Sequence, residues 1–164
     1  MNKVVLLLGS NIGDRHANLK NAISSVEQEL GRIVQSSSVY ETAPWGNIHQ
    51  QYFLNQAIII SSELTSQELM NTIVSIEEKS GRVRKIKWEP RIVDIDVLFF
   101  NNETISTKTL IVPHPGLHLR KFALIPLAEL IPEYIHPVLK KSMTELLSEL
   151  MDPLEVKKVL IHMA

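Results

Sequence analysis

The sequence has no cysteine, only 5% aromatic residues and almost no net charge. The lack of cysteine excludes disulfide bonds, thiolate metal ligands and a cysteine nucleophile. The formal net charge of −1 argues against broad electrostatic capture of nucleic acid or of an anionic membrane. Any binding of phosphate groups must therefore depend on a local cluster of cations.

Long apolar runs and the common nucleotide-binding motifs are also missing. No stretch approaches the roughly 20 apolar residues of a membrane-spanning helix. The apolar run at residues 4–8 is too short for a secretory signal, and no small-residue cleavage site follows it. The sequence has no P-loop motif, no Gly-x-Gly-x-x-Gly and no His-Glu-x-x-His. We therefore expect a cytoplasmic protein that contacts no membrane and has neither a P-loop nor a dinucleotide-binding fold.

Hydrophobic periodicity predicts the order of the main elements. A length of 164 residues with 45% hydrophobic content suits one domain over residues 1–164. A capping-box pattern at Thr65 and a stop at Gly81 delimit the second of two helices. The expected strands are 4–8, 33–40, 53–60 and 92–100, and the expected helices are 19–30 and 65–80. The order β-α-β-β-α-β is that of ferredoxin-like α+β folds with an antiparallel sheet.

The remainder of the chain is expected to form a C-terminal helical extension. After a small extension at 103–112, residues 117–131 have mixed helical character around Pro126. Ser142 begins a capping-box pattern for a last helix. Residues 156–161 are expected to form a short edge strand.

Asp94 and Asp96 are the most informative acidic pair. They lie in an otherwise apolar strand, where alternation places both side chains on one face. Two carboxylates roughly 7 Å apart repel each other by roughly 2 kcal/mol at an effective dielectric constant near 20. Either the neighbouring cations of a solvated loop relieve that repulsion, or divalent metal ions do. Mg²⁺ takes oxygen ligands and commonly binds between carboxylates and substrate phosphates.

The segment before this strand is strongly basic. It contains one tryptophan, Trp88, and the cations Arg82, Arg84, Lys85, Lys87 and Arg91. These side chains would suit the phosphates of a substrate, although spacing alone equally allows a solvated basic loop.

A second candidate group surrounds the start of the third expected strand. Phe53 and Asn55 share one face there, beside a long loop that carries Thr42 and Trp45. An aromatic ring next to an amide would suit a flat heterocycle that forms hydrogen bonds. The alternative is that Phe53 belongs to the core and Asn55 caps a turn.

An ordered series of short motifs resembles the 6-hydroxymethyl-7,8-dihydropterin pyrophosphokinase family of folate biosynthesis. The motifs that carry the resemblance are Gly9-Ser10-Asn11, Glu41-Thr42 with Pro44 and Gly46, Phe53-Leu54-Asn55, Gly81-Arg82-Val83-Arg84, Trp88-Glu89-Pro90, Arg91-x-x-Asp94-x-Asp96, Val112-Pro113-His114-Pro115 and Arg120-x-Phe122. The series runs through most of the chain. Three positions depart from residues found in many or some family members, namely Phe53, Val74 and Glu89.

The resemblance implies a reaction and assigns roles. Such an enzyme transfers the β,γ-pyrophosphoryl unit of ATP to the hydroxymethyl oxygen of the pterin, and AMP leaves. Asp94 and Asp96 would hold two Mg²⁺ ions, and Arg82 and Arg91 would stabilise negative charge in the transition state. The implied nucleotide-binding residues are Glu77, Arg82, Arg84, Trp88, Arg91, His114 and Arg120. The implied pterin-binding residues are Thr42, Trp45, Phe53, Asn55 and Phe122, the two phenylalanines by stacking.

Two other functions are compatible with parts of the pattern. A metal-dependent phosphohydrolase could use the same aspartates, and an RNA-binding module could use a ferredoxin-like fold with a basic, aromatic loop. The paired aromatic strand motif of such RNA-binding modules is missing from the sequence. We therefore expect small-molecule substrates, no nucleic-acid partner and a monomer.

Overall fold

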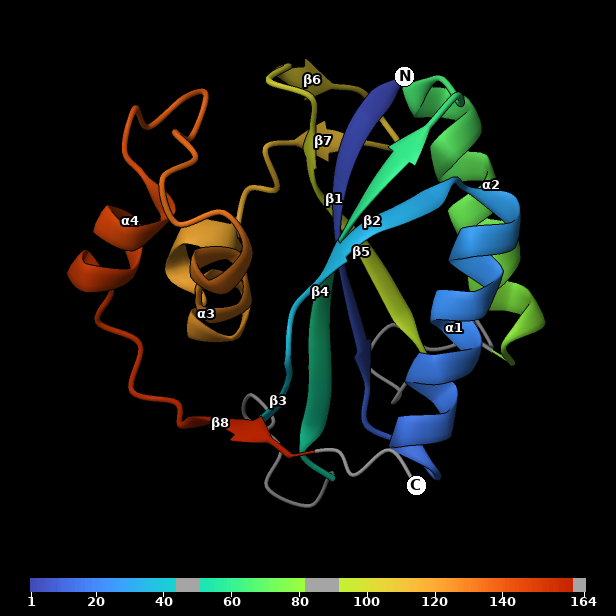
Figure 1. The fold of residues 1–164 in the computed structure, drawn as a ribbon, viewed down its shortest axis with the longest axis horizontal. Helices are drawn as coiled ribbons and strands as arrows, with labels where there is room; N and C mark the ends of the chain where they lie inside the picture. The colour runs from blue at the N-terminus through green and yellow to red at the C-terminus, as the bar shows by residue number, and fades with distance from the viewer. Residues whose placement is uncertain (44–50, 82–91, 161–164) are drawn as a thin grey trace.

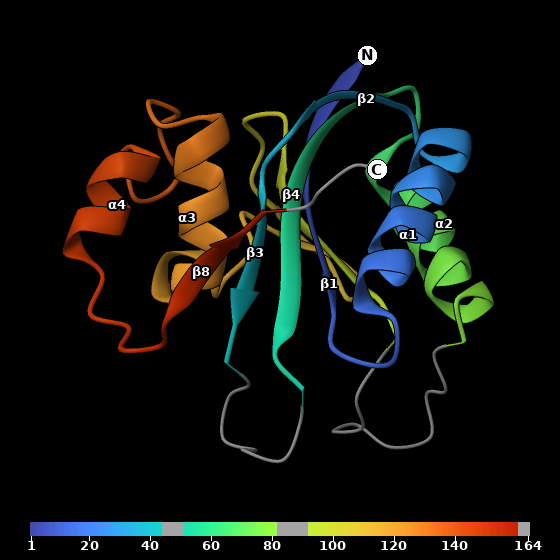
Figure 2. The same cartoon turned by 60° about the horizontal axis from the view of Figure 1, so that its bottom comes forward.

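The chain forms an antiparallel sheet that carries two helices on each face (Figures 1 and 2). The computed structural model describes residues 1–43, 51–81 and 92–160. The main sheet has the strand order β5-β1-β4-β3-β8, and β2 also pairs with β4. Every pairing in it is antiparallel. This arrangement confirms the predicted ferredoxin-like α+β class.

The strands of the main sheet are β1 (Asn2–Ser10), β2 (Arg32–Ser36), β3 (Val39–Thr42), β4 (Phe53–Ser62), β5 (Asp94–Phe100) and β8 (Val156–Val159). Central strand β1 pairs with β4 on one side and with β5 on the other. Among the strands that the structure describes, β5 is at one end of the sheet, so the two aspartates lie on an edge strand. The edge strand predicted at 156–161 is confirmed over the bounds of β8, which pairs with β3.

The helices α1 (Arg15–Glu29) and α2 (Ser66–Lys79) cover one face of the sheet. Asp14 caps α1, since its side chain accepts a hydrogen bond from the amide of Ala17. Thr65 and Glu68 form the predicted capping box at the start of α2. Local sequence therefore sets where both helices begin.

The opposite face carries α3 (Lys121–Leu130) and α4 (Met143–Glu149), preceded by the short 3-10 helix η1 (Leu117–Leu119). These elements are the predicted helical extension, and Ser142 forms its capping box. A two-stranded sheet, β6 (Ile105–Ser106) with β7 (Ile111–Val112), lies within the predicted extension at 103–112. Within the described residues, no helix is long and apolar enough to cross a membrane.

Strand alternation produces two separate cores. Val4, Leu6 and Leu8 of β1 point into the core under α1 and α2, whereas Val5 and Leu7 point toward α3 and α4. On the second face, Val5, Leu7, Ala57 and Ile59 belong to the core formed with α3 and α4. The remaining part of that face forms the floor of a cavity.

The single strand predicted at 33–40 is wrong, because the segment forms two strands. β2 and β3 both pair with β4, and Ser37 and Ser38 separate them. The Ser37 hydroxyl accepts a hydrogen bond from the amide of Ala57 at 2.9 Å, while the Ser37 amide donates to the Ala57 carbonyl. A serine side chain thus replaces part of the regular ladder at this point, and the chain changes direction.

Candidate active site

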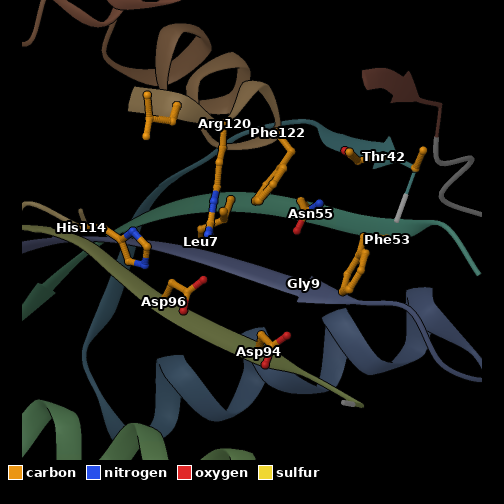
Figure 3. A pocket seen from close by; sticks show the side chains of 12 residues that line it. Leu7, Gly9, Thr42, Phe53, Asn55, Asp94, Asp96, His114, Arg120 and Phe122 are labelled. Atoms are coloured by element: carbon orange, nitrogen blue, oxygen red, sulfur yellow. The ribbon is translucent and has the colours of Figure 1, made fainter. Parts of the chain in front are cut away.

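One cavity of about 690 Å³ opens on the sheet face that α3 leaves uncovered (Figure 3). Residues from β1, β3, β4, β5 and the start of α3 surround it. The lining residues are Leu7, Gly9, Thr42, Ala43, Phe53, Asn55, Asp94, Asp96, His114, Leu119, Arg120 and Phe122. Eight of the predicted site residues are therefore brought together from segments far apart in the sequence.

The acidic pair lies on one side of this cavity, as the alternation predicts. Asp94 and Asp96 pair with Gly9 and Leu7 of β1, and both line the cavity. The buried neighbour Ile95 points to the opposite face, into the core under α1 and α2. The strand is thus fixed by its apolar face, and its acidic face is presented to the cavity.

Glu77 holds this strand from behind. Its side chain is 5% exposed on α2, and its carboxylate accepts a hydrogen bond from the amide of Ile95 at 3.0 Å. Glu77 does not line the cavity. The contact positions the residue between the two aspartates, and the predicted nucleotide contact of Glu77 stays a prediction.

Phe53 and Asn55 lie on the floor of the cavity, beside Gly9 of the neighbouring strand. Asn55 is only 5% exposed and is the cross-strand partner of Gly9. A Cβ atom at Gly9 would lie 2.6 Å from the Oδ1 atom of Asn55. A glycine is therefore needed where Asn55 folds over β1. Both residues line the cavity. Phe53 is therefore not enclosed in the core, and Asn55 does not cap a turn, because it lies within β4.

Thr42 contributes an unsatisfied polar atom. The residue is 2% exposed at the end of β3, opposite Phe53 in the strand pairing. Its hydroxyl oxygen has no hydrogen-bond partner among the residues that the structure describes. Buried polar groups are normally paired, so an unpaired one at a cavity wall indicates a place for a ligand atom.

Arg120 and Phe122 form the wall opposite the sheet. Arg120 is the N-cap residue of α3, and its guanidinium carbon lies 5.8 Å from the centre of the Phe122 ring. The same guanidinium packs against Gly116, where a Cβ atom would lie 3.1 Å from its central carbon. Figure 3 shows both side chains directed from the helix toward the sheet.

His114 lies beside Asp96 and has a defined orientation (Figure 3). Its amide donates to the Leu98 carbonyl at 3.0 Å, and its Nδ1 atom accepts from the Gly116 amide at 3.1 Å. Nδ1 is therefore an acceptor, and Nε2 carries the proton of the neutral ring. Burial, together with the nearby Arg120 guanidinium, lowers the pKa of His114. The ring is thus held as a neutral donor.

A second cavity of about 280 Å³ adjoins the first and shares Asp96 and His114 with it. Residues 107–111, together with Met70, Ile95, Val97 and Pro115, line the rest. This site could not be predicted from the sequence, because strands of two residues are too short to show alternation. The shared residues place it where a ligand could extend from the main cavity.

Several predicted site residues lie outside the described residues. These are Trp45, Arg82, Arg84, Trp88 and Arg91, together with the departure at Glu89. Conversely, the cavity contains Leu7, Gly9, Ala43 and Leu119, to which no site role was assigned. Gly9 belongs to a motif of the resemblance, but its contact with Asn55 depends on the register between β1 and β4.

Among the described residues, no group of three or more His, Cys, Asp or Glu side chains could hold a metal ion. Two carboxylates that share a cavity are nevertheless sufficient for Mg²⁺, which keeps several waters and takes further oxygen ligands from substrate phosphates. Asp94 and Asp96 therefore fit such an ion.

Fold and cavity together define the class: a ferredoxin-like α+β protein with a cavity on one face of its sheet. The family model described as "7,8-dihydro-6-hydroxymethylpterin-pyrophosphokinase (HPPK)" matches residues 5–132. The chain belongs to this family. Its members are ATP-dependent pyrophosphokinases that transfer pyrophosphate from ATP to 6-hydroxymethyl-7,8-dihydropterin in folate biosynthesis.

Relatives cover almost the whole chain. A 2-amino-4-hydroxy-6-hydroxymethyldihydropteridine pyrophosphokinase of Methylorubrum extorquens is 40% identical over 160 residues, which are 97% of this chain and 99% of the relative. An enzyme of the same name from Bacillus subtilis is 44% identical over 132 residues, which are 79% of each chain.

A solved structure has the same fold at low sequence identity. The HPPK-DHPS of Plasmodium falciparum matches with a TM-score of 0.74 and 21% identity, over 91% of this chain. The match covers 43% of that chain, so this protein spans less than half of the fused one. The likeness supports the fold alone.

Proposed function

We propose that the 690 Å³ cavity is where this chain performs the family's pyrophosphoryl transfer. The observation that carries the proposal is the meeting of Asp94 and Asp96 with Asn55 and two phenylalanines in one cavity. Carboxylates suit the metal–phosphate end of a reaction, and an amide between aromatic rings suits a flat heterocycle. In this proposal, the cavity holds the pterin and the phosphate end of ATP.

The pterin ring lies between Phe53 and Phe122 in this proposal. Asn55 and Thr42 face the same space, and the amide can donate and accept while the threonine hydroxyl lacks a partner. Stacking provides affinity, and the buried polar groups distinguish the polar edge of a pterin from a purely apolar ring. Trp45 remains a predicted pterin contact outside the described residues.

ATP would extend from the main cavity into the smaller one, because the two share Asp96 and His114. The neutral His114 ring would donate from Nε2 to a phosphate oxygen, and the Arg120 guanidinium would add a positive charge at the same wall. The nucleoside would then occupy the cavity beside the hairpin. The other predicted nucleotide-binding residues are Glu77, Arg82, Arg84, Trp88 and Arg91.

Asp94 and Asp96 would hold Mg²⁺, with two ions expected. When bound, the metal would neutralise phosphate charge and lower the pKa of the pterin hydroxyl. Arg82 and Arg91 are proposed to stabilise the charge that develops during transfer. The hydroxymethyl group loses its proton to water, and its oxygen attacks the β-phosphorus of ATP. The bond from that phosphorus to the oxygen shared with the α-phosphate breaks, and AMP leaves with this oxygen. No enzyme nucleophile is required, so the protein's contribution is positioning and electrostatics.

A coupled assay for AMP tests the proposal. The protein is supplied with ATP and Mg²⁺, with and without 6-hydroxymethyl-7,8-dihydropterin, and the nucleotide products are separated. We expect AMP only when the pterin is present and only with a divalent cation. Release of inorganic phosphate without pterin would instead support a metal-dependent phosphohydrolase and contradict the proposal.

The roles of the cavity residues need a second measurement. Phe122→Ala should weaken pterin binding, whereas Arg120→Ala should weaken ATP binding, each measured by titration without turnover.

We also propose that the chain acts as a monomer, because one copy supplies every described wall of the cavity. Light scattering during gel filtration checks the molar mass, and a dimer that loses activity on dilution would contradict this.

A further inference from the structure

The last part of the described chain links two walls of the cavity. Residues 151–159, here called the C-terminal strap, leave α4, pass the start of α3 and end in β8 on the edge of β3 (Figures 1 and 2). The strap lies beyond residue 132, where the family match ends. None of its residues lines the main cavity.

Asp152 connects the strap to α3. One carboxylate oxygen accepts a hydrogen bond from the backbone amide of Lys121 at 3.1 Å, and the other accepts from the amide of Leu154 at 3.0 Å. The second bond is local, between residues two positions apart, and it fixes the orientation of the carboxylate. Asp152 therefore presents a negative oxygen to the first residue of the helix from a remote part of the chain.

The start of α3 depends on such a partner. Its N-cap residue is Arg120, whose side chain makes no capping hydrogen bond. The first amides of a helix have no partner within the helix, and a carboxylate there also interacts favourably with the helix dipole. Lys121, the residue that Asp152 contacts, lies between Arg120 and Phe122, which both line the cavity.

The other end of the strap is fixed to the wall that carries Thr42. In the pairing of β3 with β8, Thr42 lies opposite Val156. Residues 152–156 thus span from the helix that carries Phe122 to the strand that carries Thr42. Both of these residues belong to the proposed pterin site, so the strap joins two parts of that site.

We propose that Asp152 is a positioning residue for the substrate site, because it holds the first turn of α3 so that Arg120 and Phe122 face the sheet. This inference rests on the proposed function of the cavity. Without Asp152, the first turn of α3 has fewer fixed partners, and a smaller fraction of molecules has both side chains in the binding orientation. Apparent affinity falls by that fraction.

The test measures pterin and ATP binding to Asp152→Ala without turnover, with a non-hydrolysable ATP analogue. From the usual cost of losing a helix cap, we expect a 5- to 30-fold rise in the Kd of the pterin, to order of magnitude. Asp152→Asn keeps one acceptor oxygen and should give an intermediate Kd. Glu155→Ala is the matched control, because it removes from the same strap an exposed carboxylate that forms an ion pair with exposed Lys157.

A double-mutant cycle shows whether the effect passes through the hydrogen bond to Lys121. Lys121→Pro removes the donor, and proline is well tolerated at the first position of a helix. Arg120 already has φ −127° and ψ 115°, which is compatible with a following proline. In this background, Asp152→Ala should change the Kd of the pterin far less than it does in the wild type. Equal effects in both backgrounds would overturn the proposed route.

The outcomes separate the inference from the proposed function. If the wild type does not bind the pterin, the proposed function fails before any variant is compared. If the wild type binds and Asp152→Ala binds equally well at a temperature where both are folded, the positioning role is refuted. A lower Tm with unchanged Kd would show that Asp152 serves stability alone, and that outcome also refutes the positioning role.

Discussion

Gly9→Ala offers a precise test of how the floor of the cavity is built. The added Cβ would lie 2.6 Å from Asn55 Oδ1, and ordinary contact begins at 3.4 Å, so the amide must move by about 0.8 Å. The nearest backbone atom, the Leu54 carbonyl oxygen, would be 3.7 Å away and needs no adjustment. The substitution therefore displaces one side chain and leaves the strand pairing in place.

The expected loss is that of one buried hydrogen bond to the substrate. A buried polar group left unpaired costs about 1–3 kcal/mol, which corresponds to roughly a 5- to 150-fold rise in the Kd of the pterin. Stability should change little, since alanine is less costly than glycine within a strand by about 0.5–1 kcal/mol. Fluorescence or calorimetric titration measures the Kd, and thermal unfolding measures the stability.

The Gly9→Ala/Asn55→Ala double variant is the control. If Gly9→Ala acts only by displacing Asn55, the double variant should bind the pterin no worse than Asn55→Ala does. Binding by Gly9→Ala that equals that of the wild type would refute the assignment of Asn55 to the pterin. A large fall in Tm would show that the backbone, not the side chain, absorbs the added atom.

Three other predictions concern the opposite side of the cavity and the core. Asp96→Ala should reduce turnover to near the detection limit at ordinary Mg²⁺ while thermal unfolding stays unchanged within a few degrees, and an active variant would contradict the metal assignment. The pKa of His114 is lowered, so the ring should remain neutral as the pH falls to 6.5, the ordinary pKa of a histidine. Stability should decrease only below pH 6.5, because the unfolded chain then takes up a proton more readily than the folded ring does. NMR titration measures the pKa, and Arg120→Ala should raise it. Glu77→Ala should leave the amide of Ile95 without its acceptor and lower the free energy of unfolding by about 1–3 kcal/mol, whereas Glu77→Gln should lose less in chemical denaturation.

Strand alternation explains why much of the site could be predicted. A period of two places Asp94 and Asp96 on one face whatever surrounds the strand, and the same rule pairs Phe53 with Asn55. Capping residues such as Thr65 act on amides three residues away, so they can also be read from local sequence. These features need no knowledge of how distant segments meet.

Contacts between distant segments could not be predicted from local patterns. The requirement for glycine at position 9 appears only when β1 is set in register with β4. The hydrogen bond that the Lys121 amide donates to Asp152 joins residues 31 positions apart, and no periodicity in the sequence indicates it. The break at Ser37 was also missed, since a serine that replaces a ladder hydrogen bond looks like any other strand residue in sequence.

One strand face links the cavity to the core. On β4, Phe53 and Asn55 line the cavity, and the next two residues on the same face, Ala57 and Ile59, are buried against α3 and α4. A larger side chain at Ala57 would press on the helical layer that carries Phe122. Under the proposed pterin site, substitutions at these two core positions are constrained by substrate recognition as well as by folding. A search for variants with altered pterin preference should include them.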